Sequence, residues 1–256
     1  MPVIVAALFI ALLGLLLGSF AGVVAYRVPR RESPLTGRSH CDSCGATVAA
    51  HDNVPVVSWL LLRGRCRSCG AAIPVRYPLV ELALGAGFLA SYLVFEDEGA
   101  AAVALACAFL FVLAVITLTD LEHRIIPNVV LGPAAIGGVA LVALVDTGDL
   151  PPHLLAAAIG GGVLLLVSLL YPRGMGMGDV KLAFVMGIFL GRAVAPALLI
   201  GFAAGAIYGV ALMARHGSEA RKQAVPFGPF LALGGVAGLF VGDEIVDWYV
   251  DSFFGG

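Results

Sequence analysis

Charged residues are scarce in this chain of 256 residues. Asp, Glu, Lys and Arg make up 12% of it, whereas an ordinary soluble domain carries about 25%. Hydrophobic residues make up 60%, and the mean hydropathy is +1.00. A single soluble core does not need so much apolar surface. The composition therefore argues against an ordinary soluble domain and indicates that a lipid bilayer surrounds most of the chain.

Lys and Arg are absent before the first apolar run, which begins near residue 3. A cleaved signal peptide carries its positive charge before the apolar stretch. We therefore expect residues 1–26 to remain in the chain as a first transmembrane helix. The sequence also lacks an internal repeat and a low-complexity tract, which argues against a repeat architecture.

Long apolar runs recur along the chain, and most have the length of about 17–25 residues that a membrane-spanning helix needs. We predict an all-α polytopic membrane protein with about eight transmembrane helices. Its parts are a first helix over 1–26, a hydrophilic insert over 27–77 and a multi-helix region over 78–256. The apolar runs lie at roughly 3–26, 79–95, 100–119, 129–145, 154–171, 180–190, 193–213 and 229–247.

The positions of Lys and Arg predict the orientation, because cytoplasmic connections are enriched in these residues. With eight spans and the N-terminus outside, 14 of the 15 basic residues fall on the cytoplasmic side. Merging 180–213 into one span would place Arg215 on the other side. The charge rule therefore favours a break near Gly191-Arg192 and a cytoplasmic insert.

Four cysteines form two C-x2-C pairs in the insert, Cys41 with Cys44 and Cys66 with Cys69, and a glycine follows each pair. Four thiolates are a ligand set of tetrahedral structural zinc. Two disulfides are the alternative, but thiols stay reduced in the cytoplasm. About 50 residues with few large apolar side chains also need a link to hold a fold. We predict a structural Zn²⁺ in a small zinc-ribbon-like insert.

Two aspartates stand at the cytoplasmic ends of predicted helices. Asp120 ends the third apolar run, and Asp179 follows the glycine-rich segment 174–178. Ionisable groups at membrane depth are costly and by default indicate function. In a close pair of carboxylates one keeps a proton while the other activates water, and such a pair can cleave a peptide bond. The alternative is structural, with Asp120 facing interfacial water and Asp179 capping a helix that begins at Val180.

Glycine and proline interrupt the backbone beside both aspartates. Gly176 and Gly178 let the chain unwind and approach a substrate closely, and Pro127 interrupts the chain after Asp120. A dinucleotide-binding loop is excluded, because no strand precedes these glycines and their spacing is not G-x-G-x-x-G. An extended substrate can pair with exposed backbone that lines a wet cavity.

Together these motifs resemble the prepilin peptidase family, the type IV leader peptidases among the GxGD membrane aspartyl proteases. The resemblance runs through nearly the whole chain. It rests on both cysteine pairs, on Asp120 with Ile126-Pro127-Asn128, and on the segment from Gly176 to Leu182. Other matching segments are Gly18-Ser19-Phe20, Tyr26-Arg27-Val28-Pro29, Asp52-Asn53-Val54-Pro55, Arg76-Tyr77-Pro78 and Pro226-Phe227-Gly228-Pro229-Phe230.

The resemblance implies an enzyme of the bacterial cytoplasmic (inner) membrane that cuts the basic leader from type IV prepilins and pseudopilins. Asp120 and Asp179 would carry out the proteolysis at the cytoplasmic face. The enzyme would then N-methylate the new N-terminus with S-adenosylmethionine as donor. Its partners would be these substrates and the lipid bilayer, with no nucleic acid. The residues that would position substrate and backbone are Gly176, Gly178, Lys181 and Pro127.

Three other residues have two readings each. Glu81 lies in the first turn of the helix expected from 79, where it either interacts with the helix dipole or takes part in methyl transfer. Gly22 stands where family members usually carry Asn, which leaves proteolysis untouched and bears on methylation. His123 either tunes Asp120 or faces solvent, and we expect it to face solvent.

Three other functions compete with this interpretation. A membrane protease of the presenilin-like branch would not need the cysteine insert. A non-enzymatic membrane protein would use the insert to bind a partner and would lack activity on a pilin substrate. A proton-carrying transporter would need its aspartates near the bilayer midplane, whereas these lie near one surface.

Overall fold

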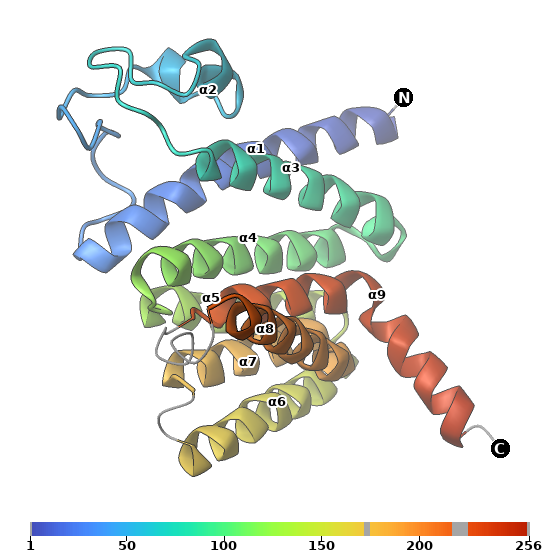
Figure 1. Cartoon of the computed structure of the whole chain (residues 1–256). Helices are drawn as coiled ribbons and strands as arrows, with labels where there is room; N and C mark the ends of the chain where they lie inside the picture. Colours follow the sequence, from blue (N-terminus) through green and yellow to red (C-terminus); the bar gives the residue numbers. More distant parts are fainter. Residues whose placement is uncertain (1, 172–174, 217–224, 255–256) are drawn as a thin grey trace. The chain divides into compact units, whose positions relative to one another are not determined.

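The computed structural model describes residues 2–171, 175–216 and 225–254. Within these ranges the elements are helices joined by loops, and the only strand-like pairings are two isolated antiparallel bridges in the insert. The chain divides into two compact units, Met1–Asp97 and Glu98–Gly256 (Figure 1). Gly174, Arg173, Arg221 and Lys222, which enter the sequence arguments, lie outside the described residues. The three-part division of the sequence stays a prediction.

The first unit consists of two long helices with the insert between them (Figure 1). Gly14 and Gly18 lie where the two helices pack, and a Cβ on Gly18 would come 2.6 Å from the Cα of Glu81. Small residues let membrane helices approach this closely. The insert therefore begins and ends on a paired scaffold. The helices of this unit are α1 (Pro2–Arg27), α2 (Val57–Leu61) and α3 (Arg76–Phe95).

The second unit is a helix bundle around α7, in which ten of 14 residues are buried. Gly187 of α7 faces the backbone of Ala157 so closely that no side chain fits there. The rings of Phe109 and Phe189 stack with their centroids 5.1 Å apart. The helices of this unit are α4 (Ala100–His123), α5 (Asn128–Val145), α6 (Leu150–Leu170), α7 (Met177–Leu190), α8 (Val194–His216) and α9 (Gly228–Phe254).

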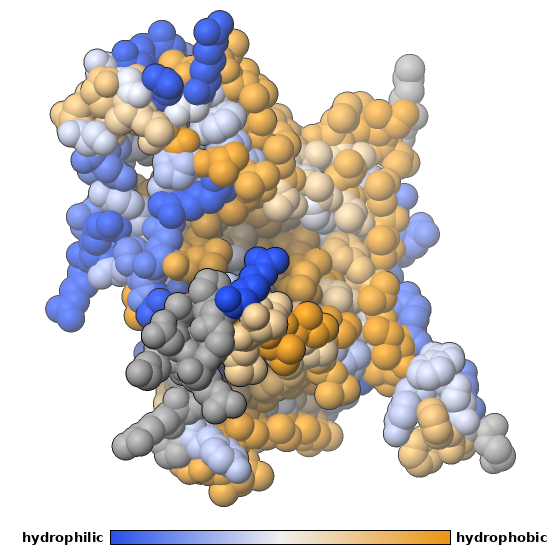
Figure 2. Space-filling view, viewed as in Figure 1, coloured by the Kyte–Doolittle hydropathy of each residue, from blue (hydrophilic) through white to orange (hydrophobic). Residues whose placement is uncertain are grey.

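Large apolar side chains cover the outer faces of the long helices, and hydrophilic ones gather over the insert (Figure 2). Exposed examples are Ile4 and Phe9 in the first unit and Leu144 and Ile207 in the second. Water would not tolerate such surfaces, whereas lipid chains match them. Seven runs in the described residues are long and apolar enough to cross a membrane. The chain is thus an α-helical, multi-pass membrane protein, as predicted.

The predicted break near Gly191-Arg192 is confirmed. The short turn η5 (Gly191–Ala193) separates α7 from α8, and Gly191 has a φ of 54°, which favours glycine. Eight long helices match the eight apolar runs. The count of seven spans arises because α7 and α8 form one run, Met177–Arg215. Alone, the 14 residues of α7 rise about 21 Å, less than the ~30 Å hydrocarbon core.

Candidate functional site

Asp120 lies in the last turn of α4 and is only 6% exposed. Its Oδ2 accepts a hydrogen bond from the backbone N–H of Gly228, the first residue of α9, at 2.8 Å. A Cβ at residue 228 would itself lie 2.8 Å from that oxygen. Only glycine therefore lets the start of α9 approach the carboxylate this closely.

Asp179 is the third residue of α7 and is 9% exposed. Its Oδ2 accepts a hydrogen bond from the N–H of Gly176 at 3.2 Å, and a carboxylate is favoured at a helix N-terminus. Gly176 is the N-cap, so the alternative in which Asp179 caps a helix beginning at Val180 is wrong. The alternative placed all the glycines before the helix. In the structure the helix begins at Met177 and includes Gly178.

The two aspartate motifs meet at one end of the second unit. The carboxyl groups of Asp120 and Asp179 interact electrostatically. A Cβ on Gly178 would come 2.9 Å from the Cβ of Ile126, so the glycine segment lies directly against the segment after α4. Pro127 is the N-cap of α5, in extended conformation. The segments that carry the two carboxyl groups are thus in contact at the ends of α4 and α7, and the two groups are close enough to interact electrostatically.

Lys181 binds Asn128 rather than an aspartate: its Nζ donates to Oδ1 of Asn128 at 3.0 Å. The bond joins the first residue of α5 to the second turn of α7. Lys181 therefore ties together the two segments that carry the motifs, which is a positioning contact.

The two cysteine pairs adopt the same local structure. In each, the N–H of the first cysteine donates to the residue five positions on, and the following glycine donates back to the first cysteine. Gly45 and Gly70 have φ values of 70° and 73°, which favour glycine. An antiparallel bridge closes each pair, joining His40 to Thr47 and Arg65 to Ala72.

The four thiols gather at one point. All ligand atoms of Cys41, Cys44, Cys66 and Cys69 lie within 4.8 Å of one another, and the sulfurs of Cys41 and Cys69 are 3.8 Å apart. Four sulfurs at about 2.3 Å from a tetrahedral zinc would lie about 3.8 Å from one another. None of the four forms a disulfide. The cluster could therefore hold a metal ion.

Charge within the cluster favours a cation. Backbone N–H groups, first that of Cys44, lower the pKa of Cys41 to about 6. At Cys69 the backbone N–H of Ala71 favours the thiolate, but the other thiols and burial outweigh it and raise the pKa to about 12. Neighbouring sulfurs cannot all carry charge unless a metal ion compensates them.

Glu81 is buried in the second turn of α3 rather than in the first turn. The predicted position of Glu81 was wrong because α3 begins at Arg76, before the apolar run. An interaction of Glu81 with the dipole in the first helical turn therefore has no structural basis. Oε2 of Glu81 accepts a hydrogen bond from the N–H of Val56 at 2.7 Å. Val56 is β-branched and has a φ of 61°, a strained conformation. The insert is thus held in a strained form against Glu81.

Comparison with known proteins agrees with this geometry. Residues 12–95 match the bacterial peptidase A24 N-terminal domain, and residues 107–210 match the type IV leader peptidase family. The chain belongs to the type IV leader peptidase family. No solved structure matches it.

Curated relatives of the leader peptidase family match nearly their whole length. A prepilin leader peptidase/N-methyltransferase of Aeromonas salmonicida is 34% identical over 94% of this chain and 92% of its own. One of Bacillus subtilis is 31% identical over 94% and 97%. The type 4 prepilin-like proteins leader peptide-processing enzyme of Escherichia coli is 35% identical over 89% and 91%.

Two features of this leader peptidase escaped the sequence reasoning. The sequence identifies Gly228 only as part of a segment that matches the family. The approach of its backbone to Asp120 is a three-dimensional contact that the residue type does not predict. His123, expected to face solvent, does so only in part: its side chain is 27% exposed, and its buried Nε2 lies 3.8 Å from Oε2 of Glu122. An ionisable residue in the last helical turn, three residues after Asp120, was the available signal.

Proposed function

We propose that this chain cleaves the leader peptide from type IV prepilins and pseudopilins, with Asp120 and Asp179 as the catalytic pair. The observation that carries the proposal is two buried carboxyl groups, at the end of α4 and the start of α7, that are close enough to interact electrostatically. The family and the names of its relatives support the substrate class.

The chemistry follows from the pairing of the carboxyl groups. Two carboxyl groups in one site share a proton, because both do not ionise easily. The ionised member takes a proton from water, which attacks the scissile carbonyl carbon. The protonated member donates its proton to the carbonyl oxygen, and the leaving amine then takes up a proton as the C–N bond breaks.

The backbone beside the aspartates provides room for an extended substrate. Gly176 and Pro127 have extended backbone, whereas Gly178 is the second residue of α7 and the space that its side chain would fill is taken by Ile126. A substrate strand can therefore approach the carboxyl groups along either segment. The Lys181–Asn128 bond holds the two segments together, so Lys181 acts as a positioning residue.

We assign Zn²⁺ to the cysteine cluster, with Cys41, Cys44, Cys66 and Cys69 as ligands. The spacing of the sulfurs and the four-thiol ligand set support zinc. The ion would be structural, because four protein ligands leave no open position for substrate. It would join the two cysteine pairs of an insert that has little apolar core.

The orientation of the chain fits this chemistry. We propose that the N-terminus lies outside the cytoplasmic membrane, and that the insert and both aspartates face the cytoplasm. The positions of 14 of the 15 basic residues support this. A basic leader then stays in the cytoplasm while the apolar segment after it enters the bilayer, which puts the scissile bond near Asp120 and Asp179.

A second activity follows cleavage in this proposal, as the names of the relatives suggest. The chain N-methylates the amine that cleavage exposes. S-adenosylmethionine supplies an activated methyl group for this step. The roles of the chain's own residues are to bind the new N-terminus and to exclude water from it.

One experiment tests both activities. Purified full-length protein is incubated with a prepilin, with and without S-adenosylmethionine, and the products are weighed by mass spectrometry. We expect loss of the leader in both samples and a gain of one methyl group only with the donor. An uncut prepilin would refute the peptidase assignment, and a cut but unmethylated product would refute the methyl transfer.

A further inference from the structure

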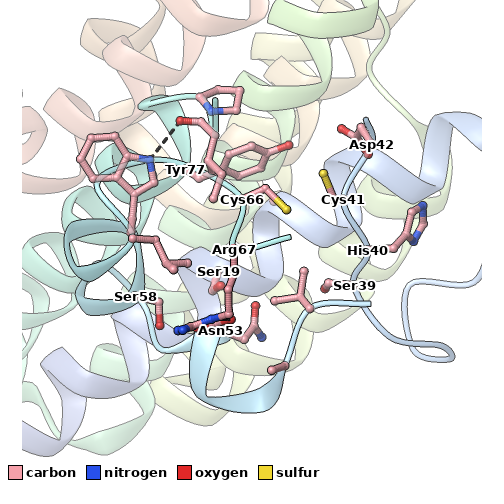
Figure 3. Close-up of a pocket in the computed structure, with 18 of the residues that line it drawn as sticks. Ser19, Ser39, His40, Cys41, Asp42, Asn53, Ser58, Cys66, Arg67 and Tyr77 are labelled. Carbon is pink, nitrogen blue, oxygen red and sulfur yellow. Dashed lines mark hydrogen bonds and ion pairs between the residues drawn. The ribbon is translucent and has the colours of Figure 1, made fainter. Parts of the chain in front are cut away.

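The second unit has an apolar groove of about 400 Å³ between α5 and α6, with α7 as its floor. Helices α5 and α6 both pack against α7 and hardly touch each other. Of the residues that line the groove, only Asn128 and Lys181 are polar. The cavity of the first unit is different, because polar residues such as Asp42, Asn53 and Arg67 line it (Figure 3). The groove therefore suits an apolar occupant.

The groove begins beside both aspartate motifs. On α5 its first residue is Asn128, which follows Pro127. On α7 its first residue is Val180, which follows Asp179. From Asn128 to Ala135, near the middle of α5, it extends about 10 Å, since a helix rises 1.5 Å per residue. The groove thus leads from the aspartates toward the centre of the bilayer.

Small residues form part of both walls, with Gly132 and Ala135 on α5 and Gly161 on α6. A Cβ on Gly132 would meet nothing within 4 Å, so the space beside it is open. Lipid chains are as apolar as a helix surface, and helices therefore associate in membranes where small residues allow close packing. Such walls favour a helix that inserts its side chains over a fluid lipid chain.

The charge of the groove lies at one end. Lys181 is the charged residue among those that line it, and the bond of 3.0 Å from its Nζ to Oδ1 of Asn128 keeps that charge beside the aspartates. A basic leader is repelled from this end, whereas an apolar segment is not. Lys181 therefore favours one direction of the substrate, with the apolar segment in the groove and the leader outside it.

We propose that the groove between α5 and α6 binds the apolar segment that follows the scissile bond of the substrate, as a helix lying along α5. About two helical turns, or roughly seven residues, fit its length of about 10 Å. The bond before this helix then lies beside Asp120 and Asp179. The inference rests on the proposed leader cleavage and adds the surface that selects a bond preceding an apolar helix.

Gly132→Leu fills the groove, and Gly137→Leu is its matched control. Both glycines are exposed on α5, and a Cβ on either meets nothing within 4 Å, but Gly137 does not line the groove. With purified full-length protein, Gly132→Leu should raise the KM for a full-length prepilin about tenfold or more, because an overfilled site excludes its ligand. It should change kcat less than about twofold. Gly137→Leu should match wild type in both constants.

Photocross-linking identifies the occupant of the groove. In one variant p-benzoylphenylalanine replaces Leu165, which lines the groove. In its control the same group replaces the neighbouring Leu166, which is exposed outside the groove. An Asp120→Asn background leaves the prepilin uncut. We expect a cross-link from position 165 to the apolar segment of the prepilin, suppressed by excess unlabelled prepilin, and none from position 166.

Three results would overturn the proposal while cleavage by wild type leaves the proposed function standing. They are a cross-link from position 165 to lipid alone, a cross-link to a second copy of the chain, and a wild-type KM for Gly132→Leu. If wild type left the prepilin uncut, the proposed function would fail, and this inference with it.

Discussion

The insert and the helix bundle hold their functional side chains in different ways. In the bundle, Asp120 and Asp179 sit at helix ends, and each accepts one backbone N–H from a glycine. In the first unit, Glu81 of α3 holds the insert through a bond from loop backbone, and four cysteines of the insert form one cluster. Packed helices position the aspartates, whereas a loop bond and the cysteine cluster position the insert. Leader cleavage and the fold of the insert should therefore fail separately.

The largest separation is expected from the aspartates. Asp120→Asn and Asp179→Asn should each lower leader cleavage by a factor on the order of 10⁴, because each carboxyl group is useless without the other. The double variant should be no worse than either single one. Mass spectrometry of prepilin products measures this.

The contrast sharpens if metal content is measured on the same variants. It should be unaltered, because neither aspartate belongs to the cysteine cluster. If either single variant kept a cleavage rate within tenfold of wild type, the assignment of Asp120 and Asp179 as a catalytic pair would be refuted.

Removal of the metal should produce the opposite pattern. Stripping the metal with a chelator, or replacing Cys66 with Ser, should lower the unfolding temperature of the insert strongly, because structural zinc stabilises such folds. Leader cleavage should change by less than about tenfold. Metal analysis, Trp59 emission during heating and product masses check the three quantities.

The matched control for the metal is Cys107→Ser, which changes the one cysteine outside the cluster. It should leave the metal content at one ion per chain. A metal-free protein whose insert unfolds at an unchanged temperature would contradict the role of the cluster.

A smaller effect is expected from Gly228→Ala. The added Cβ would lie 2.8 Å from Oδ2 of Asp120, so the start of α9 must shift and the carboxyl group loses its N–H donor. We expect cleavage to fall about 10–100-fold, since misplacement by about 1 Å can cost 10²-fold.

Gly162→Ala is the control for this change, because a Cβ at that exposed position meets nothing within 4 Å. It should cleave like wild type. Equal activities for the two alanine variants would mean that the approach of Gly228 does not position Asp120.

The smallest effect concerns pH and the insert. The guanidinium group of Arg67 lowers the pKa of Asp52, so their pairing stabilises the insert above the ordinary pKa of about 3.9. This contribution is lost as the pH falls through the lowered pKa. Asp52→Asn should thus unfold the insert at a slightly lower temperature at pH 7, and the difference should vanish near pH 2–3. Trp59 emission during heating measures it, and a difference independent of pH would contradict it.

Much of the fold was predictable because hydropathy and charge act locally along the chain. The eight apolar runs became eight helices, and the break at Gly191 followed from counting basic residues. Helix ends were less predictable. α3 extends back to Arg76, since Pro78 is tolerated in a first turn, and this moved Glu81 out of the first turn.

The site was predictable only in part. Acidic residues in apolar surroundings and paired cysteines both predict functional sites well. A buried acid is energetically costly, and paired cysteines are typical metal ligands. The bond between Val56 and Glu81 has no such signal, because the two residues lie 25 positions apart in the sequence. The contact of Gly228 with Asp120 is likewise a matter of three-dimensional approach, and no spacing rule encodes it.

The pairing of α1 with α3 also sets the timing of biosynthesis. Gly18 packs against Glu81, yet the start of α3 leaves the ribosome 49 residues after the end of α1. At about 5–20 residues per second this takes roughly 2–10 s. During that interval α1 stands in the bilayer without its partner, and the cysteine cluster lacks its second pair. Metal capture, once Cys69 emerges, would shorten the tether between the two helices before they meet.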